Sequence, residues 1–169
     1  MKKSVLRYGL FGSITICVLF LFSWFAFKDA DMSTQEVLGY ASMIISLSFV
    51  YFGIKHFRDK ENQGKVTFKK GLTIGIVISL ITALAFGVLD LIYVKFINPD
   101  FLTEYYEVIL NEMEETLPPE EFKLEQAKME AEKQFFADPM MNFLIMFLTV
   151  FIIGFIISLI SSLILQRKN

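Results

Sequence analysis

Residues 71–94 read GLTIGIVISLITALAFGVLDLIYV, and this stretch decides the fold because its only charged residue is Asp90. As an α-helix it would rise about 1.5 Å per residue, enough to cross the roughly 30 Å hydrocarbon core of a bilayer with some tilt. Lysines stand on both sides of it, at Lys69, Lys70 and Lys95. We therefore expect a transmembrane helix over residues 70–95.

Three further apolar runs predict transmembrane helices over residues 8–27, 34–57 and 139–165. The first is too long for the core of a signal peptide and ends in bulky Trp24 and Phe25, so we expect it to remain uncleaved. Ser33 and Glu36 have the spacing of a capping box. Asp138-Pro139 is typical of a helix start. The predicted fold class is all-α: a polytopic membrane protein with four transmembrane helices, forming a single membrane domain over residues 1–169.

The distribution of lysine and arginine predicts the orientation. One side of the expected membrane carries eleven such residues: Lys2, Lys3, Arg7, Lys55, Arg58, Lys60, Lys65, Lys69, Lys70, Arg167 and Lys168. The other side carries five: Lys28, Lys95, Lys123, Lys128 and Lys133. The positive-inside rule then places both termini in the cytoplasm, and an even number of spans requires them to share a side.

The segment before the fourth apolar run is strongly acidic. Residues 97–138 hold twelve Asp and Glu and three Lys, a charge of −9, and the remaining chain is therefore +7, since the whole chain is −2. Such a segment discourages binding to nucleic acid or to anionic lipid. We expect residues 98–138 to form a helical insertion on the non-cytoplasmic side.

Within this insertion, Asn98-Pro99-Asp100 marks one helix start and Pro118-Pro119 separates that helix from a second. Apolar residues recur at helical spacing in both, which predicts an amphipathic helical pair. In the first helix they are Leu102, Tyr105 or Tyr106, Ile109, Met113 and Leu117. In the second, one face holds Leu124, Ala127, Ala131 and Phe135, and a neighbouring face holds Phe122, Met129 and Phe136. The alternative is that the stretch from Glu112 to Glu121 is mobile.

Small residues recur every four positions in the third and fourth runs. They are Gly71, Gly75, Ser79, Ala83 and Gly87 in the third, and Gly154, Ser158 and Ser162 in the fourth. Small residues let membrane helices approach closely. We interpret these stripes as packing within one four-helix bundle. The alternatives are a homo-oligomer interface or the lining of a permeation path.

Asp90 is the candidate functional residue, because ionisable groups inside a membrane are costly and often functional. Its position near the end of the third run predicts an interfacial site within reach of water and of Lys95 or Lys28, with ion or ligand handling as the alternative. His56 is better interpreted as an anchor at headgroup level than as a metal ligand. Cys17 is the only cysteine.

The chain shows no catalytic constellation, metal-ligand cluster or phosphate-binding loop, and its acidic segment lacks the spacing of a calcium loop. We therefore expect no enzyme activity, no catalytic residue, no bound metal and no cofactor.

Three stretches carry a family resemblance: residues 38–59, 64–71 and 96–101. Together they resemble the domain-of-unknown-function 4199 family, uncharacterised four-helix inner-membrane proteins of Gram-negative bacteria. The resemblance implies an inner-membrane location with residues 98–138 in the periplasm. It transfers no catalytic or binding residues.

Two functional hypotheses follow. The first is a non-enzymatic structural or interaction protein that contacts the lipid bilayer and either a protein partner or further copies of itself, but no nucleic acid. The second is a small transporter or channel subunit that uses Asp90 and the small-residue helix interfaces.

Overall fold

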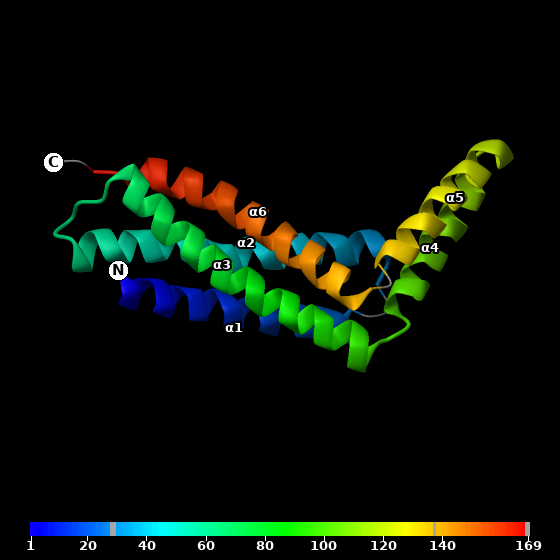
Figure 1. The fold of residues 1–169 in the computed structure, drawn as a ribbon, viewed down its shortest axis with the longest axis horizontal. Coiled ribbons are helices and arrows are strands. Elements are labelled where there is room, and N and C mark those ends of the chain that lie inside the picture. The colour runs from blue at the N-terminus through cyan, green and yellow to red at the C-terminus, as the bar shows by residue number, and fades with distance from the viewer. Residues whose placement is uncertain (28–29, 137, 168–169) are drawn as a thin grey trace. The chain divides into compact units, whose positions relative to one another are not determined.

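The computed structural model describes residues 1–27, 30–136 and 138–167, and these form six α-helices (Figure 1). They are α1 (Lys2–Ala26), α2 (Met32–His56), α3 (Phe68–Ile92), α4 (Phe101–Thr116), α5 (Pro119–Phe136) and α6 (Pro139–Leu165). Short π-helical turns, η1 (Phe57–Glu61) and η2 (Tyr93–Ile97), extend α2 and α3. Lys28 and Lys168, which the orientation argument counts, lie outside the described residues.

Four of the helices are long and apolar enough to cross a membrane: α1, α2 with η1, α3 with η2, and α6. The expected all-helical class with four candidate membrane helices is therefore confirmed. α6 has the expected limits, but α1 begins at Lys2 rather than at residue 8. The charge-free stretch marks the part of a helix suited to hydrocarbon, and the helix itself continues through charged residues beside it.

The start of α2 differs from the sequence prediction. Asp31 is the N-cap, and its carboxylate accepts hydrogen bonds from the Thr34 amide (2.8 Å) and the Thr34 hydroxyl (2.7 Å). The predicted capping box of Ser33 and Glu36 was therefore wrong. Asp31 and Thr34 have the same three-residue spacing two residues earlier, and a carboxylate is a strong cap.

The chain divides into two compact units. Unit 1 comprises Met1–Phe86 and Phe147–Asn169, and unit 2 comprises Gly87–Met146. Unit 1 contains α1, α2 and most of α3 and α6. Unit 2 contains α4 and α5 together with the last turns of α3 and the first turns of α6, so it extends beyond the segment 98–138 that the charge pattern marks.

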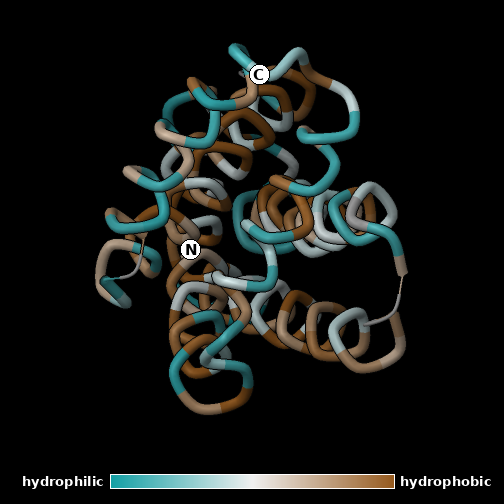
Figure 2. The backbone as a smooth tube through the Cα atoms, turned by 90° about the vertical axis from the view of Figure 1, so that its right-hand side faces the viewer, coloured by the Kyte–Doolittle hydropathy of each residue, from teal (hydrophilic) through white to brown (hydrophobic). Residues whose placement is uncertain are grey.

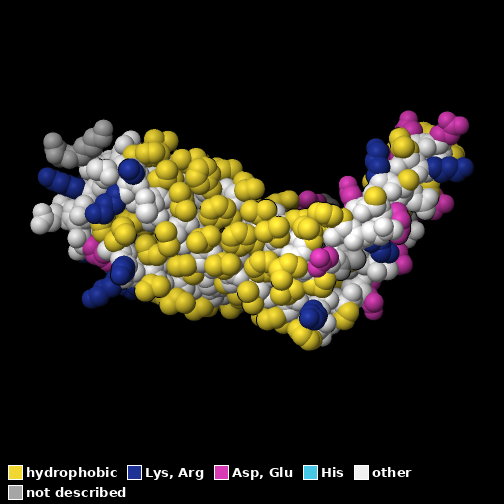
Figure 3. Space-filling model, viewed as in Figure 1, with side chains coloured by type: hydrophobic (Ala, Val, Ile, Leu, Met, Phe, Trp, Pro, Cys, Tyr) yellow, Lys and Arg dark blue, Asp and Glu magenta, His cyan; other side chains and the backbone are white. Residues whose placement is uncertain are grey.

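The interior of unit 1 is built from aliphatic and aromatic side chains such as Ile16, Leu47, Ile78 and Val150, all fully buried. The long helices carry extended hydrophobic stretches (Figure 2), and hydrophobic side chains cover much of their surface on the face seen in Figure 3. On α1 the exposed residues recur every four positions: Leu6, Leu10, Ile14, Val18 and Phe22. An uninterrupted apolar outer face is costly in water and suits contact with lipid.

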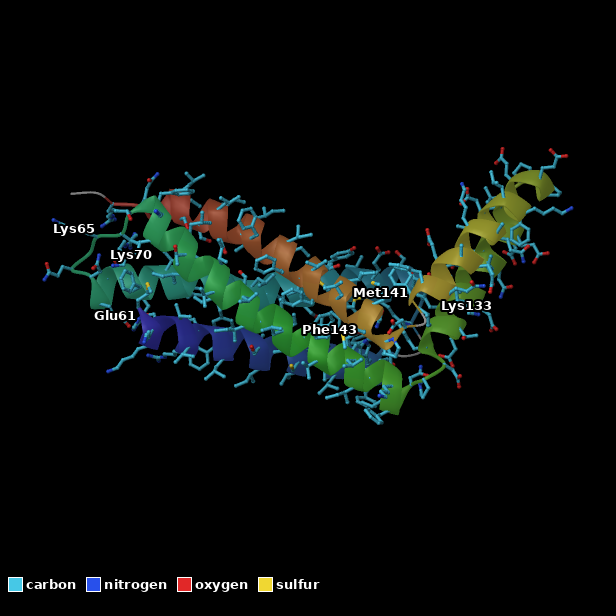
Figure 4. All side chains as sticks on the ribbon, viewed as in Figure 1. Glu61, Lys65, Lys70, Lys133, Met141 and Phe143 are labelled. Atoms are coloured by element: carbon cyan, nitrogen blue, oxygen red, sulfur yellow. The ribbon has the colours of Figure 1, made fainter. Side chains whose placement is uncertain are left out.

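One end of unit 1 is closed by the connection from α2 to α3. Gln63 and Gly64 have positive φ values of 53° and 80° and turn the chain back. Val66 then pairs with Arg167 through two backbone hydrogen bonds of 3.2 and 2.8 Å, and Arg58 donates to the Leu165 carbonyl at 3.4 Å. These contacts bring the end of α6 to the same end of unit 1, where Glu61, Lys65 and Lys70 also lie (Figure 4).

In unit 2, α4 ends at Thr116 and α5 begins at Pro119, so the predicted break at Pro118-Pro119 is confirmed. The predicted start of α6 is also confirmed, because Asp138 accepts a hydrogen bond from the Met140 amide at 2.9 Å.

Candidate functional site

The small residues of α3 and α6 meet within unit 1 and form what we call the small-residue interface. The Ser79 and Ser158 hydroxyl oxygens lie 3.3 Å apart, and Ser158 also donates to the Gly154 carbonyl at 2.6 Å. A Cβ added to Gly75 would lie 2.6 Å from Ser158 Oγ, and one added to Gly154 would lie 2.6 Å from Ser79 Oγ. The two helices therefore touch at a distance that only glycine opposite serine allows.

The register of this interface is antiparallel. Gly71 faces Ser162, with 3.1 Å between an added Cβ and Ser162 Oγ, and four residues further along α3 Gly75 faces Ser158. Ser79 faces Gly154 in the same way. The structure thus places these six predicted residues together, inside one chain. Ala83 and Gly87, the remaining members of the predicted stripe, are both buried.

A second set of small residues, on α1, was not predicted from the sequence. Gly9 and Gly12 are buried, and an added Cβ would lie 2.9 Å from Ile81 Cδ1 and 2.5 Å from Thr82 Oγ1, respectively. Ser13 donates to the Ile81 carbonyl at 3.3 Å. Gly12 and Ser13 follow Gly9 by three and four positions. This spacing places the three residues on one helix face, and it is the pattern in the sequence that could have predicted the contact.

Asp90 lies in unit 2, where α3 meets α6. Its carboxyl oxygen Oδ2 accepts a hydrogen bond from Asn142 Nδ2 at 2.6 Å, and the side chains are 5% and 7% exposed. The sequence placed Asp90 within reach of water and of Lys95 or Lys28. Instead it is buried, and the Lys95 ammonium lies over the Phe96 ring, 5.7 Å from its centroid. Asn142 had one signal in the sequence: it is the only side-chain amide in the fourth apolar run.

A polar cluster, also missed, joins α1 to the end of α2 in unit 1. Ser4 is fully buried and donates its hydroxyl proton to Glu61 Oε1 at 2.8 Å. Its oxygen lies 2.9 Å from His56 Nδ1, and a hydroxyl has only one proton, so Nδ1 must carry the donor hydrogen. Glu61 also pairs with the Met1 amino group.

His56 is not a base for Ser4 in this arrangement. A base would have to accept the hydroxyl proton, whereas His56 donates to the hydroxyl oxygen and the proton is directed to Glu61. The contacts instead tie the start of α1 to the end of α2. His56 therefore has a protein partner, and its expected role as an anchor at headgroup level stays a prediction.

The described residues contain no group of three or more His, Cys, Asp or Glu side chains positioned to hold a metal ion. The acidic side chains of α4 and α5 are mostly exposed and spread along both helices.

In unit 2, α4 and α5 are in contact, and Tyr106 of α4 and Met129 of α5 are both buried. Burial, with nearby Glu132 and Tyr105, raises the pKa of the Tyr106 phenol. Of the two faces predicted for α5, the one with Phe122, Met129 and Phe136 is buried or half-buried. The other face, with Leu124, Ala127, Ala131 and Phe135, is exposed.

A family model described as "Protein of unknown function (DUF4199)" matches residues 7–167, nearly the whole chain. The chain belongs to this family. The match covers all four candidate membrane helices as well as α4 and α5. No curated protein and no solved structure matches the chain. For a DUF4199 protein, a function must therefore be argued from its own residues.

Proposed function

We propose that this DUF4199 protein is a non-enzymatic inner-membrane protein whose α4–α5 segment is an amphipathic helical pair that docks a partner protein in the periplasm. The observation that carries the proposal is the contrast between the two units. Unit 1 has an apolar outer face suited to lipid, whereas the segment of unit 2 that contains α4 and α5 carries a charge of −9 and exposes both acidic and apolar side chains.

The positions of basic residues support the orientation. The contacts of Glu61 with Met1 and of Val66 with Arg167 bring the start of α1, the end of α2, the start of α3 and the end of α6 to one end of unit 1. Lysine and arginine gather at this end (Figure 3). By the positive-inside rule this end faces the cytoplasm, and α4 and α5 then face the periplasm.

This topology predicts a labelling pattern. In a Cys17→Ala background, we expect a membrane-impermeant maleimide to label Gln126→Cys in intact spheroplasts and Lys65→Cys only after lysis, because Gln126 lies on α5 and Lys65 lies between α2 and α3. Both side chains are exposed, so the two sites are matched in accessibility. Labelling of Lys65→Cys before lysis would contradict the orientation.

The docking function predicts a photocrosslink. A benzophenone amino acid at Tyr105 on α4, or at Phe122 on α5, should form a specific adduct with another protein in living cells. In a chain without the crosslinker, replacing residues 101–136 by a flexible linker should produce the phenotype of a null strain. Recovery of no adduct from either position, together with normal growth of the linker variant, would refute the proposed function.

A transporter or channel subunit is the weaker candidate. The small-residue interface is closed within one chain by the Ser79–Ser158 contact and by glycines that leave no room for a methyl group. The buried Asp90 carboxyl is already engaged by a side-chain partner, Asn142. These contacts are those expected of helix packing.

A further inference from the structure

α5 has two apolar faces, and α4 covers only one. Phe122, Met129 and Phe136 recur every seven residues, so they lie along one side of the helix, and Met129 is 7% exposed. Leu124 and Phe135 lie on the opposite side and are 59% and 53% exposed. Exposed Ala127 and Ala131 lie between them. We call Leu124, Ala127, Ala131 and Phe135 the outer face of α5.

The outer face is flanked by acids. With about 100° of rotation per residue, Glu120, Glu121 and Glu132 lie within roughly a quarter turn of the line from Leu124 to Phe135. Lys128 lies on the same side, but its ammonium pairs with Glu125 at 2.5 Å. The flanks of the outer face are therefore net negative, within a segment whose charge is −9.

We propose that the outer face of α5 binds an amphipathic helix of another protein, one with a short apolar stripe flanked by lysine and arginine. This inference rests on the proposed function and specifies its partner. Leu124 and Phe135, the two large exposed side chains, are eleven positions apart, which is about three helical turns. A partner helix with apolar residues at the same spacing would place them against these two side chains. The acidic flanks select a basic partner and give the encounter a salt dependence.

Charge argues against the other possible occupants. A second copy of this chain would bring its own −9 segment against the first, and like charges placed together across an interface are unfavourable. An anionic lipid surface would repel the same segment.

The test uses the full-length protein in nanodiscs of zwitterionic lipid and two fluorescent peptides of the same length. One peptide carries a leucine stripe flanked by lysines, and the other carries the same stripe flanked by glutamates. We expect fluorescence anisotropy to show saturable binding of the lysine peptide that weakens as salt is raised, and at least tenfold weaker binding of the glutamate peptide. Empty nanodiscs give the lipid background.

The variants locate the site. Leu124→Gln with Phe135→Gln should weaken binding of the lysine peptide by at least about tenfold. Gln126→Ala, which changes an exposed residue on another side of α5, should leave it unchanged. Circular dichroism of each variant checks that helix content is retained, so that loss of binding reports the face itself.

The outcomes separate this inference from the proposed function. Equal binding of the two peptides, or equal binding by the Leu124/Phe135 variant and the wild type, would overturn the proposed binding of a basic helix to the outer face. A benzophenone at Leu124 that crosslinks one copy of this chain to another would also overturn it, because the partner would then be a second copy. If Tyr105 crosslinks to another protein while Leu124 and Phe135 do not, docking stands and the outer face is not its site. If Tyr105, Phe122, Leu124 and Phe135 all fail to crosslink and the linker variant grows normally, both proposals fall.

Discussion

Gly154→Ala is expected to lower the free energy of unfolding by about 1–3 kcal/mol, the usual cost of adding a methyl group to a packed interior. The new Cβ would lie 2.6 Å from both Cβ and Oγ of Ser79 and 3.1 Å from Leu47 Cδ2. Ser79 is short and fully buried on α3, so it cannot move aside without moving the helix. The loss should appear despite the better helix propensity of alanine, worth about 1 kcal/mol.

The measurement is reversible unfolding in mixed micelles, and α2 offers the matched control. Gly39→Ala places its Cβ 3.9 Å from a single atom, Phe20 Cζ, so this variant should be as stable as the wild type or slightly more stable. Adding Ser79→Gly to Gly154→Ala restores room for the methyl group and should recover much of the loss. If Gly154→Ala and Gly39→Ala unfold alike, the close α3–α6 contact is wrong.

Asn142→Leu and Asp90→Leu are each expected to lower the free energy of unfolding by about 1–3 kcal/mol, the cost of leaving a buried polar group without a hydrogen-bond partner. The first substitution leaves the Asp90 carboxyl without the amide that donates to it, and the second leaves the Asn142 amide without its acceptor. The same unfolding measurement gives the loss for each variant.

Two further variants test whether Asp90 serves helix packing or has a chemical role. Asp90→Leu with Asn142→Leu removes both partners, and should be less destabilising than the sum of the single losses. Asp90→Asn retains an acceptor for Asn142 and should unfold close to the wild type. Additive losses in the double variant would refute the coupling of the two side chains. Loss of an ion flux in Asp90→Asn at unchanged stability would favour the transporter hypothesis instead.

The sequence was informative wherever composition alone determines structure. Long charge-free runs can only be helices if they lie in lipid, because backbone groups there must bond within the segment. The four candidate membrane helices and the break at Pro118-Pro119 followed from this reasoning and from proline geometry. The cap of α2 was missed because Asp31 and Ser33 both offer the required spacing, and only the backbone conformation decides between them.

Contacts between distant residues were much less predictable. Asp90 and Asn142 are 52 positions apart, as are Ser4 and His56. Nothing local in either sequence neighbourhood indicates the partner, because the pairing depends on how two helices are rotated about their axes. The same limit applies to α5, where both apolar faces were visible in the sequence but α4 could cover only one of them.

The bridge between Val66 and Arg167 has a consequence for the order of synthesis. Val66 is almost completely buried, and both of its backbone partners come from a residue at the far end of the chain. A ribosome makes the connection between α2 and α3 long before it makes α6. This connection therefore stays open, with Val66 unprotected and Arg58 lacking the Leu165 carbonyl, until α6 has been inserted. Closure of unit 1 at that end thus waits for the synthesis of α6.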